Sequence, residues 1–407
     1  MPPQETISAA GARAKTPHFV LLIALTALGP LSLHVFLPSM PGLQTVFGTT
    51  AGTVQFVFTA YLIALAAAQL VLGPLSDRFG RRPVMLAGLG LFLAGTLLGL
   101  AVQSIGWMIF ARILQAVGSC AGMVLGRAMV RDVYGRERAT EAIAYLTMAM
   151  VVVPMLSPAI GGVLDQHYGW HAVFYLMLAY GVVMTVISLR SLHETHHERH
   201  SVGAMGLLYG FVVLLGIRRF RGYAFNTAMT VGAFFGFAGT APRIAVEELG
   251  LTPISYGVCF MSISLAFMAG NFGAARLTRR FGGEQMMLAG GLIGLVALSA
   301  MLAAVLLGTL TATGMFAAVA AMAFGNGFSL PNSTAGAISV DPMRAGAASG
   351  LVGFSQMGLG AVASYIVPNV LDGGLVSMSV VMVVFALLAV VAQLVWLGRP
   401  SLPRASA

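Results

Sequence analysis

The stretch GPLSDRFGRRPVML, residues 73–86, decides the fold of this chain. One apolar run ends at Gly73, a carboxylate and three arginines follow within a tight turn, and Pro83 begins the next apolar run. Such a turn can pair Asp77 with an arginine or with a helix N-terminus at a membrane surface, forming a latch that holds one conformation. Charge retention on one side of the membrane is the simpler alternative, but it does not need these glycines. The residues of this predicted cytoplasmic gate motif are Gly73, Asp77, Arg78, Gly80, Arg81 and Arg82.

The composition predicts a membrane protein. The 407 residues are 58% hydrophobic and 9% charged, whereas a soluble domain carries roughly 25% charged residues. The apolar residues form runs of about 20, long enough to cross a hydrocarbon core about 30 Å thick, and in lipid such runs must be helices. The chain is therefore predicted to be an all-α polytopic membrane protein. The twelve expected spans are 18–41, 53–74, 83–103, 107–130, 141–163, 170–190, 222–245, 254–275, 285–308, 311–334, 345–370 and 374–397.

The net charge of +9 could suggest a nucleic-acid partner, but its distribution argues against one. Nearly all arginines lie in alternate gaps between the spans. Among the intervening gaps, only the one near Arg243 carries a basic residue. This alternation is the positive-inside rule, which predicts a multi-pass membrane protein with both termini in the cytoplasm. The two cysteines, Cys120 and Cys259, fall inside apolar runs and are expected to be buried thiols.

The chain divides into two related halves. The fragment DRFGRR at 77–82 is echoed by RRFGGE at 279–284, and each copy follows the second span of its half. A two-fold repeat around a central cavity is typical of a secondary transporter. The predicted parts are a cytoplasmic tail (1–17), a six-helix bundle (18–190), a cytoplasmic linker with an interfacial helix (191–221), a second six-helix bundle (222–397) and a cytoplasmic tail (398–407).

These motifs resemble those of the major facilitator superfamily. AAAQLVLGPLSDRFGRRPVML (66–86) is similar to the loop signature of its twelve-span drug:proton antiporters, within them the bicyclomycin and chloramphenicol resistance (Bcr/CflA) group. Further similar motifs are FLPSMP (36–41), ARILQAVGSCAG (111–122), VPMLSPAIGGVL (153–164) and RAGAASGLVGFSQM (344–357). The resemblance implies two pseudo-symmetric six-helix bundles, and multidrug efflux by alternating access with proton antiport. It also implies a location in the bacterial inner (plasma) membrane.

Arg112 and Gln115 are three residues apart in the middle of a span and therefore share a helical face. A charge at this depth is costly and almost always faces the protein interior or a water-filled cavity. One interpretation is a structural arginine bonded to backbone carbonyls. The resemblance implies another, in which Arg112 senses the protonation of a partner on the first helix.

His34 stands at the position where the resembled exporters carry a membrane-embedded carboxylate, and none of the chain's 13 acidic residues lies deep in a span. An imidazole titrates near pH 6.5 and could take over the role of the acid. Its protonation would add charge near Arg112, which favours neutral or anionic cargo. We expect His34 to face Arg112 from the first helix.

Two further groups of residues are candidates for function. Pro154, Pro158, Gly161 and Gly162 make the fifth span kinkable and closely packed; the resemblance implies a hinge or seal, and a purely structural kink is the alternative. Polar and large side chains at depth are candidates for the wall of a substrate cavity, although any single one of them is more often a packing residue. They are Thr26, Tyr61, Asn226, Phe234, Phe235, Asn326, Phe328 and Gln356.

No nucleophile motif, phosphate-binding loop or catalytic acid–base pair is present, so no enzyme and no cofactor is predicted. The linker segment SLHETHHERH (191–200) has histidines at metal-ligand spacing, but its position in a linker argues against a metal site. The predicted function is secondary export of small, mainly hydrophobic drugs or metabolites (amphenicol- or bicyclomycin-like) by a functional monomer in the lipid bilayer. The expected partners are the substrate and protons, with no nucleic acid. The alternative is an uncoupled facilitator of the same fold, or an exporter of neutral or anionic metabolites.

Overall fold

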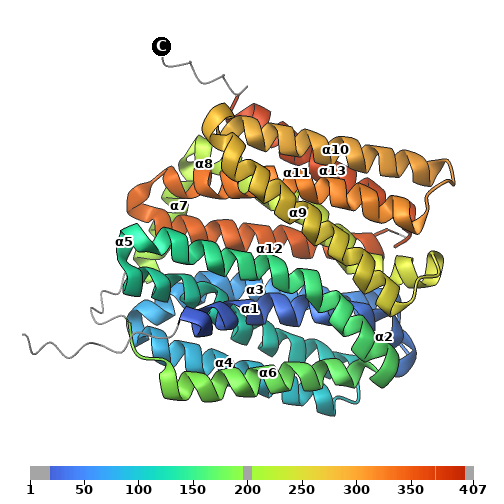
Figure 1. Ribbon diagram of the computed structural model, residues 1–407, viewed down its shortest axis with the longest axis horizontal. Coiled ribbons are helices and arrows are strands. Elements are labelled where there is room, and N and C mark those ends of the chain that lie inside the picture. Colours follow the sequence, from blue (N-terminus) through green and yellow to red (C-terminus); the bar gives the residue numbers. More distant parts are fainter. Residues whose placement is uncertain (1–18, 196–203, 372, 399–407) are drawn as a thin grey trace, which may run out of the picture.

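The computed structural model describes residues 19–195, 204–371 and 373–398, and this part of the chain is helical without a strand (Figure 1). The α-helices are α1 (Phe19–Val35), α2 (Met40–Phe47), α3 (Ala51–Phe79), α4 (Arg81–Ala101), α5 (Ile105–Tyr168), α6 (Trp170–Ser191), α7 (Ala204–Gly216), α8 (Arg218–Arg243), α9 (Pro253–Phe281), α10 (Gly283–Leu306), α11 (Ala312–Ser339), α12 (Ala345–Asn369) and α13 (Leu375–Trp396). Short turns of other helix types are η1 (Leu37–Ser39), η2 (Ile244–Glu248) and η3 (Pro342–Arg344).

Eleven helical segments within the described residues are long and apolar enough to cross a membrane, and the twelfth crossing is the second part of α5. Arg112, near the start of α5, bonds to Ser32 of α1, and Gly161, near its end, packs on the carbonyl of Val35 only three residues further along α1. A straight helix would separate residues 112 and 161 by about 73 Å. The backbone of α5 therefore reverses direction, and the contact of Arg127 Nη2 with Met150 Sδ at 3.1 Å places the reversal between them. The prediction of twelve crossings is confirmed.

The crossings form two six-helix bundles. Figure 1 shows the first half (α1–α6) below and the second half (α8–α13) above, with α7 at the left end. The two halves meet along a seam in which α3 packs against α12 and α5 against α9. We call the end that carries α7 and the α3–α4 and α9–α10 turns the linker end, and the opposite end, with the α8–α9 and α12–α13 connections, the far end.

The internal repeat is visible in the backbone. Gly80, before α4, has φ 101° and ψ 152°, and Gly282, before α10, has φ 89° and ψ 152°. Positive φ is a conformation that glycine adopts at little cost, which explains why both echoed fragments keep Phe-Gly at this turn. The two halves therefore place the same tight turn between their second and third crossings.

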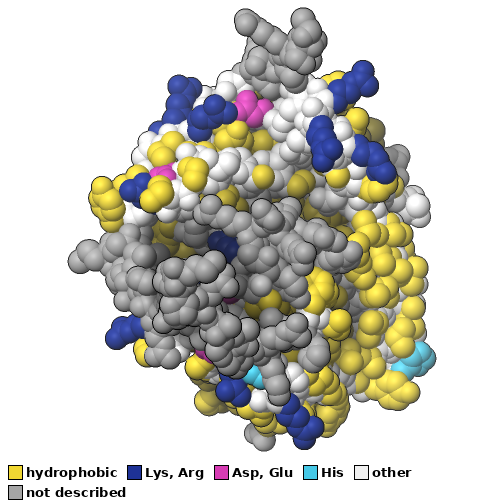
Figure 2. Space-filling view, turned by 60° about the vertical axis from the view of Figure 1, so that its left-hand side comes forward, with side chains coloured by type: hydrophobic (Ala, Val, Ile, Leu, Met, Phe, Trp, Pro, Cys, Tyr) yellow, Lys and Arg dark blue, Asp and Glu magenta, His cyan; other side chains and the backbone are white. Residues whose placement is uncertain are grey.

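The surface fits a bilayer. Figure 2, turned so that the linker end comes forward, shows Lys and Arg side chains around this end and a flank covered by hydrophobic side chains. Exposed large hydrophobic residues lie along the helices, for example Val71, Val182 and Val296. An apolar flank between charged ends is the surface of a multi-pass membrane protein.

Candidate functional site

Arg112 is the centre of a buried polar network in the first half. Its side chain is fully buried. Nη1 donates to Ser32 Oγ at 3.1 Å and to Gln115 Oε1 at 2.8 Å, and Nη2 donates to the Ser32 carbonyl oxygen at 3.1 Å. Gln115 Nε2 donates in turn to Thr96 Oγ1 at 2.8 Å. The network ties α5 to α1 and α4 and brings Arg112 and Gln115 together on one helical face.

Aromatic rings complete the surroundings of this cation. The guanidinium carbon lies 4.3 Å from the ring centre of Tyr61 and 4.7 Å from that of Phe36. Tyr61 is fixed by its own hydroxyl, which donates to the Gly29 carbonyl oxygen at 3.3 Å and lies 2.9 Å from Ser119 Oγ. Among the described residues no carboxylate pairs with Arg112, so ring faces and carbonyl dipoles compensate its charge. Tyr61 therefore belongs to the arginine network rather than to an open cavity wall.

His34 does not face Arg112, and that expectation is wrong. Its Nδ1 lies 2.9 Å from the Pro30 carbonyl oxygen, and its ring centre lies 6.1 Å from that of Phe260 on α9. The reason is helical geometry: Ser32, which Arg112 holds, and His34 are two residues apart, which is about 200° around α1. His34 therefore points into the seam between the halves, while Arg112 lies on the opposite side of α1.

A chain of aromatic contacts continues from His34 across the seam. Phe260 lies 6.2 Å from Phe234, Phe234 lies 5.4 Å from Phe235, and Phe235 lies 6.0 Å from Phe58 on α3 of the first half. Two of these residues, Phe234 and Phe235, were among the residues that the sequence suggested for a cavity wall. Phe58 and Phe260 were not, because a phenylalanine in an apolar helix gives no signal of the side that it faces.

Two other cavity candidates have partners inside their own bundle. Thr26 Oγ1 donates to the carbonyl oxygens of Leu22 (2.8 Å) and Gly122 (3.2 Å), which closes the α1–α5 contact. Asn226 Nδ2 donates to the Ala389 carbonyl oxygen at 2.9 Å. These side chains serve packing within a half, which differs from the expected position on a cavity wall.

The remaining candidates lie in the second half. The ring of Phe328 is buried 4.9 Å from that of Phe324 on the same helix. Asn326, on α11, is buried as well, and Gln356, on α12, is half-buried. Within the described residues, none of them shares a ring contact or a hydrogen bond with the His34 aromatic chain.

The proline–glycine motif of α5 lies where α5 meets both α1 and α9. Gly161 packs on the Val35 carbonyl of α1, and Gly162 packs on the Pro253 carbonyl of α9. Gly257 of α9 packs in return on the backbone of Pro158 and Ala159. A side chain at any of these glycines would collide with backbone atoms. The backbone cannot move aside in the way that the end of a flexible side chain can. Pro154, half-buried, lies one turn before these contacts.

The gate motif is fixed at the linker end by three carboxylates. Arg81 Nη1 lies 2.6 Å from Asp77 Oδ1, and Arg81 Nε donates to Asp132 Oδ2 at 3.2 Å. Glu194, just after α6, accepts from the backbone N–H groups of Arg81 (2.9 Å) and Arg82 (3.2 Å), the first residues of α4. A carboxylate at a helix N-terminus is stabilised by the unpaired N–H groups and the helix dipole.

The other members of the motif have local contacts. The Gly73 carbonyl oxygen accepts from Ser76 Oγ at 2.7 Å, the Arg78 guanidinium lies 5.2 Å from the Phe79 ring centre, and Arg82 Nη2 donates to the Leu189 carbonyl oxygen at 3.2 Å. Asp77 pairs with an arginine, one of the two expected options. The hydrogen bonds and ion pairs of the motif described here join it to the first half and to Glu194 just after α6, and none of them reaches the second half. Asp132 and Glu194 were missed in the sequence because their partners lie 51 and 113 residues away.

No group of three or more metal-ligating side chains occurs in the ranges that the structure describes. His193 contacts the Ser191 carbonyl oxygen through Nδ1 at 3.0 Å. The other linker histidines, at positions 196, 197 and 200, lie outside the described residues.

The comparisons with known proteins agree with this architecture. The profile of the Major Facilitator Superfamily matches residues 22–365. The chain is 30% identical over 346 residues to multidrug resistance protein D of Escherichia coli (strain K12), covering 85% of this chain and 87% of that protein. It is 33% identical over 252 residues to a chloramphenicol resistance protein of Pseudomonas aeruginosa, covering 61% of this chain and 59% of that protein. Among solved structures, a D-xylose–proton symporter matches with a TM-score of 0.70 at 14% identity, covering 91% of this chain and 96% of that one.

Proposed function

The chain belongs to the Major Facilitator Superfamily, and from this premise we propose that it exports small, mainly hydrophobic drugs or metabolites by alternating access, in exchange for protons. The family consists of transporters rather than enzymes. The similarity to a multidrug resistance protein and to a chloramphenicol resistance protein supports a drug as cargo, with amphenicol- or bicyclomycin-like compounds as the first candidates.

The proposed orientation places the linker end in the cytoplasm of a bacterium and the far end outside its inner membrane. The arginines of the gate motif, of the start of α8 (Arg218, Arg219 and Arg221) and of the α9–α10 turn lie at the linker end, as the positive-inside rule requires of a cytoplasmic face. The proposed working unit is the monomer, because one chain supplies both bundles and the whole seam between them.

The proposed state of this structure is closed toward the outside. Near the far end, Gly162 packs on Pro253 backbone across the α5–α9 contact. On the other side of the seam, Thr59 Oγ1 lies 2.9 Å from Ser364 Oγ, which joins α3 to α12. Export would require these contacts to separate while the linker end closes, a rocking of two bundles about the seam.

The observation that carries proton coupling is the position of His34 in the seam. The Pro30 carbonyl can only accept, so Nδ1 carries the hydrogen in their contact, and Nε2 remains the nitrogen that can take a proton. A proton there adds charge to a half that already contains buried Arg112. The aromatic chain from Phe260 to Phe58 provides an apolar surface next to this group, which suits a neutral cargo with an apolar body.

Drug accumulation in cells tests this proposal. Bacteria that express the chain should accumulate less chloramphenicol than control cells, and a protonophore should abolish the difference. Export that persists with the protonophore would favour the alternative, an uncoupled facilitator or an exporter of neutral or anionic metabolites. A susceptibility panel that includes bicyclomycin would then define the range of cargo.

A further inference from the structure

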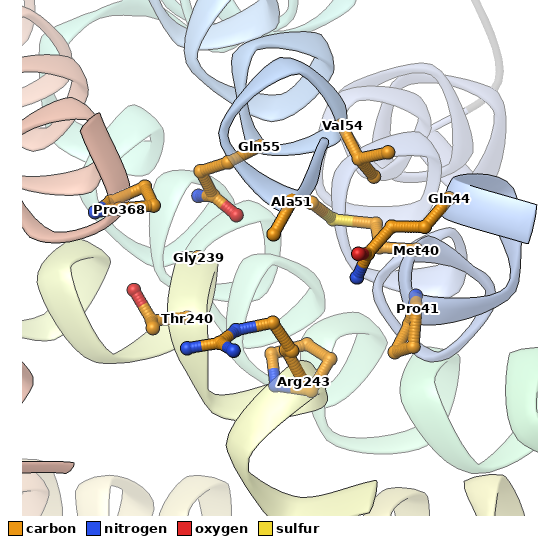
Figure 3. A pocket seen from close by; sticks show the side chains of 11 residues that line it. Met40, Pro41, Gln44, Ala51, Val54, Gln55, Gly239, Thr240, Arg243 and Pro368 are labelled. Carbon is orange, nitrogen blue, oxygen red and sulfur yellow. The ribbon is translucent and has the colours of Figure 1, made fainter. Parts of the chain in front are cut away.

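The far-end cavity between the two halves is too small for an organic ligand. Figure 3 shows Gln55 of α3 and Arg243 of α8 among the side chains that line it. Its volume is about 20 Å³, which is room for one water molecule. A surface with the features of a ligand site lies instead on the outer face of α9, at the linker end.

The outer face of α9 carries an apolar stripe. Val258, Leu265 and Phe272 recur every seven residues and are 56%, 49% and 64% exposed. Phe260 follows Val258 by two residues, about 200° around the helix, and contacts His34 in the seam. The stripe therefore points away from the seam, toward the lipid of a bilayer.

Arg276 continues this stripe toward the linker end, four residues after Phe272. α9 has 29 residues and is about 44 Å long, so it extends beyond a hydrocarbon core about 30 Å thick. The Arg276 guanidinium carbon lies 3.5 Å from the ring centre of Phe272, one turn nearer the middle of the membrane. A side chain that reached only for water would extend the other way. The ring therefore holds this cation at the level where lipid headgroups meet the hydrocarbon core.

Arg279 and Arg280 lie one turn further along, on the two sides of Arg276. Three residues correspond to about 300° and four to about 400°, so this pair flanks the stripe at about −60° and +40°. All three arginines are exposed. The negative end of the helix dipole accounts for Arg279 and Arg280, which are in the last turn, but not for Arg276. We call Phe272 and the three arginines the α9 patch.

The arginines of the α9 patch have no acceptor within the described part of the protein. None of them forms a hydrogen bond or an ion pair there, and Arg276 and Arg280 contact only ring faces. The nearest acid along the chain, Glu284, is bound by Arg219 and by Tyr223 Oη (2.8 Å). A guanidinium carries five N–H donors, and lipid tails offer no acceptor. The acceptors must therefore come from outside the chain.

The first half does not repeat this patch. Aligned on the two Phe-Gly turns, Arg276 and Arg279 correspond to Pro74 and Asp77 of the first half. Asp77 is paired with Arg81 inside the gate motif, 2.6 Å from its Nη1. The α9 patch is therefore a feature of one half, and a ligand should bind it once per chain.

We propose that the α9 patch binds the headgroup of one anionic phospholipid in the leaflet at the linker end. A phosphodiester presents the acceptor oxygens that planar guanidinium groups bind well, and its acyl chains would lie along the apolar stripe. A zwitterionic headgroup would add its own cation beside three arginines. A soluble acidic protein would have to displace lipid to reach Arg276, because Phe272 belongs to the apolar stripe.

Native mass spectrometry of the full-length protein in detergent measures this binding. The protein is titrated with phosphatidylglycerol, whose headgroup is anionic, and separately with phosphatidylethanolamine, whose headgroup adds an ammonium. We expect one phosphatidylglycerol per chain, bound by about tenfold or more tighter than phosphatidylethanolamine, since each basic residue near a membrane surface contributes about fivefold.

The first variant removes the central charge. Arg276→Gln should weaken the binding of phosphatidylglycerol by about fivefold. Arg190→Gln is the matched control, because Arg190 is an exposed arginine near the end of α6, at the same end of the molecule. This control should leave the affinity for phosphatidylglycerol unchanged.

Two further variants separate the geometry of the α9 patch from charge alone. Phe272→Leu keeps the net charge and the apolar stripe but removes the ring, and it should weaken binding by about threefold. Arg276→Lys keeps the charge but loses the planar fork, and it should weaken binding as well. Both positions are exposed, so the thermal stability of the protein should not change.

Equal binding of the two lipids would overturn the proposal. An unchanged affinity in both Arg276→Gln and Phe272→Leu, or an equal loss in Arg190→Gln, would also overturn it, because these results describe a general basic surface. Inorganic phosphate and hexaglutamate are added as competitors, each compared with sodium chloride at the same ionic strength. Displacement of phosphatidylglycerol beyond that caused by sodium chloride would assign the patch to a soluble anion or an acidic protein and overturn the proposal too. None of these measurements depends on transport.

Discussion

The guanidinium of Arg112 donates to both the hydroxyl and the backbone carbonyl oxygen of Ser32, which joins the middle of α5 to α1. His34 follows two residues later and points the opposite way, into the seam with α9. The buried cation and the proposed proton site are therefore separated by the thickness of α1. Any movement of α1 changes the environment of both groups at once, although they are not in contact.

Arg112→Lys tests whether the planar fork of the arginine is needed. A lysine keeps the charge but cannot reach Ser32 and Gln115 with the same divergent geometry. We expect drug efflux to fall by about tenfold, which corresponds to the loss of about 1.4 kcal/mol. Efflux is measured in cells at matched expression, with Arg127→Lys, at an exposed position of the same helix, as the control. Full efflux in Arg112→Lys would leave only a structural role for the arginine.

Gly162→Ala tests the closed far end. The added carbon would collide with the Pro253 backbone across the seam, so the variant should favour separation of α5 from α9. Labelling of Thr59→Cys by a thiol reagent should become faster by about tenfold if the collision costs about 1.4 kcal/mol. The matched control is Gly106→Ala, since a carbon added at Gly106 meets nothing within 4 Å.

Gly161→Ala separates packing within a half from packing across the seam. Its added carbon would meet the Val35 carbonyl of α1, inside the first half. We expect this variant to lower the thermal stability of the protein without faster labelling of Thr59→Cys. Equal acceleration by Gly161→Ala and Gly162→Ala would contradict the assignment of Gly162 to the seam.

Glu194→Gln tests the attachment of the linker to α4. The neutral amide still accepts hydrogen bonds from the backbone N–H groups of Arg81 and Arg82 but loses the favourable interaction of a charge with the helix N-terminus. The free energy of unfolding should fall by about 0.5–1 kcal/mol, measured by denaturation in detergent at low salt. High salt should reduce this difference, and a salt-independent difference would point to a cause other than charge.

Thr26→Val tests the correction to the predicted cavity wall. Valine has nearly the same shape but cannot donate to the Leu22 and Gly122 carbonyl oxygens. The free energy of unfolding should fall by about 1 kcal/mol, while the KM for drug transport stays unchanged. A changed KM with unchanged stability would contradict the packing role and support the predicted position of Thr26 on the cavity wall.

The sequence was sufficient for the membrane-spanning segments and for their arrangement in two halves, because apolar length and repeated fragments are one-dimensional signals. The sequence also placed Arg112 and Gln115 on one face, since helical spacing determines that relationship. The rotation of α1 about its own axis, which decides the direction that His34 faces, could not be predicted in this way. This helix is apolar on all sides and largely buried, so no polar stripe indicates which side His34 faces.

Contacts between residues far apart in the sequence could not be predicted from the sequence either. Glu194 meets the start of α4, and Phe260 meets His34, only because the bundles bring distant segments together. The reversal inside α5 was predicted as a gap between two spans, whereas the backbone remains helical through it. Charge and hydropathy locate the crossings, but they do not determine how a polar connection folds.

The central claim is that His34, which lies in the seam between the two halves, couples proton movement to drug movement. The most direct measurement is chloramphenicol uptake into inside-out vesicles with and without an imposed proton gradient, for the natural chain, His34→Ala, His34→Asp and the exposed control His167→Ala. We predict gradient-driven uptake by the natural chain and by His167→Ala, and its loss in His34→Ala. His34→Asp, which restores a titratable group, should regain part of the gradient response. Uptake by His34→Ala that still responds fully to the gradient would contradict the account.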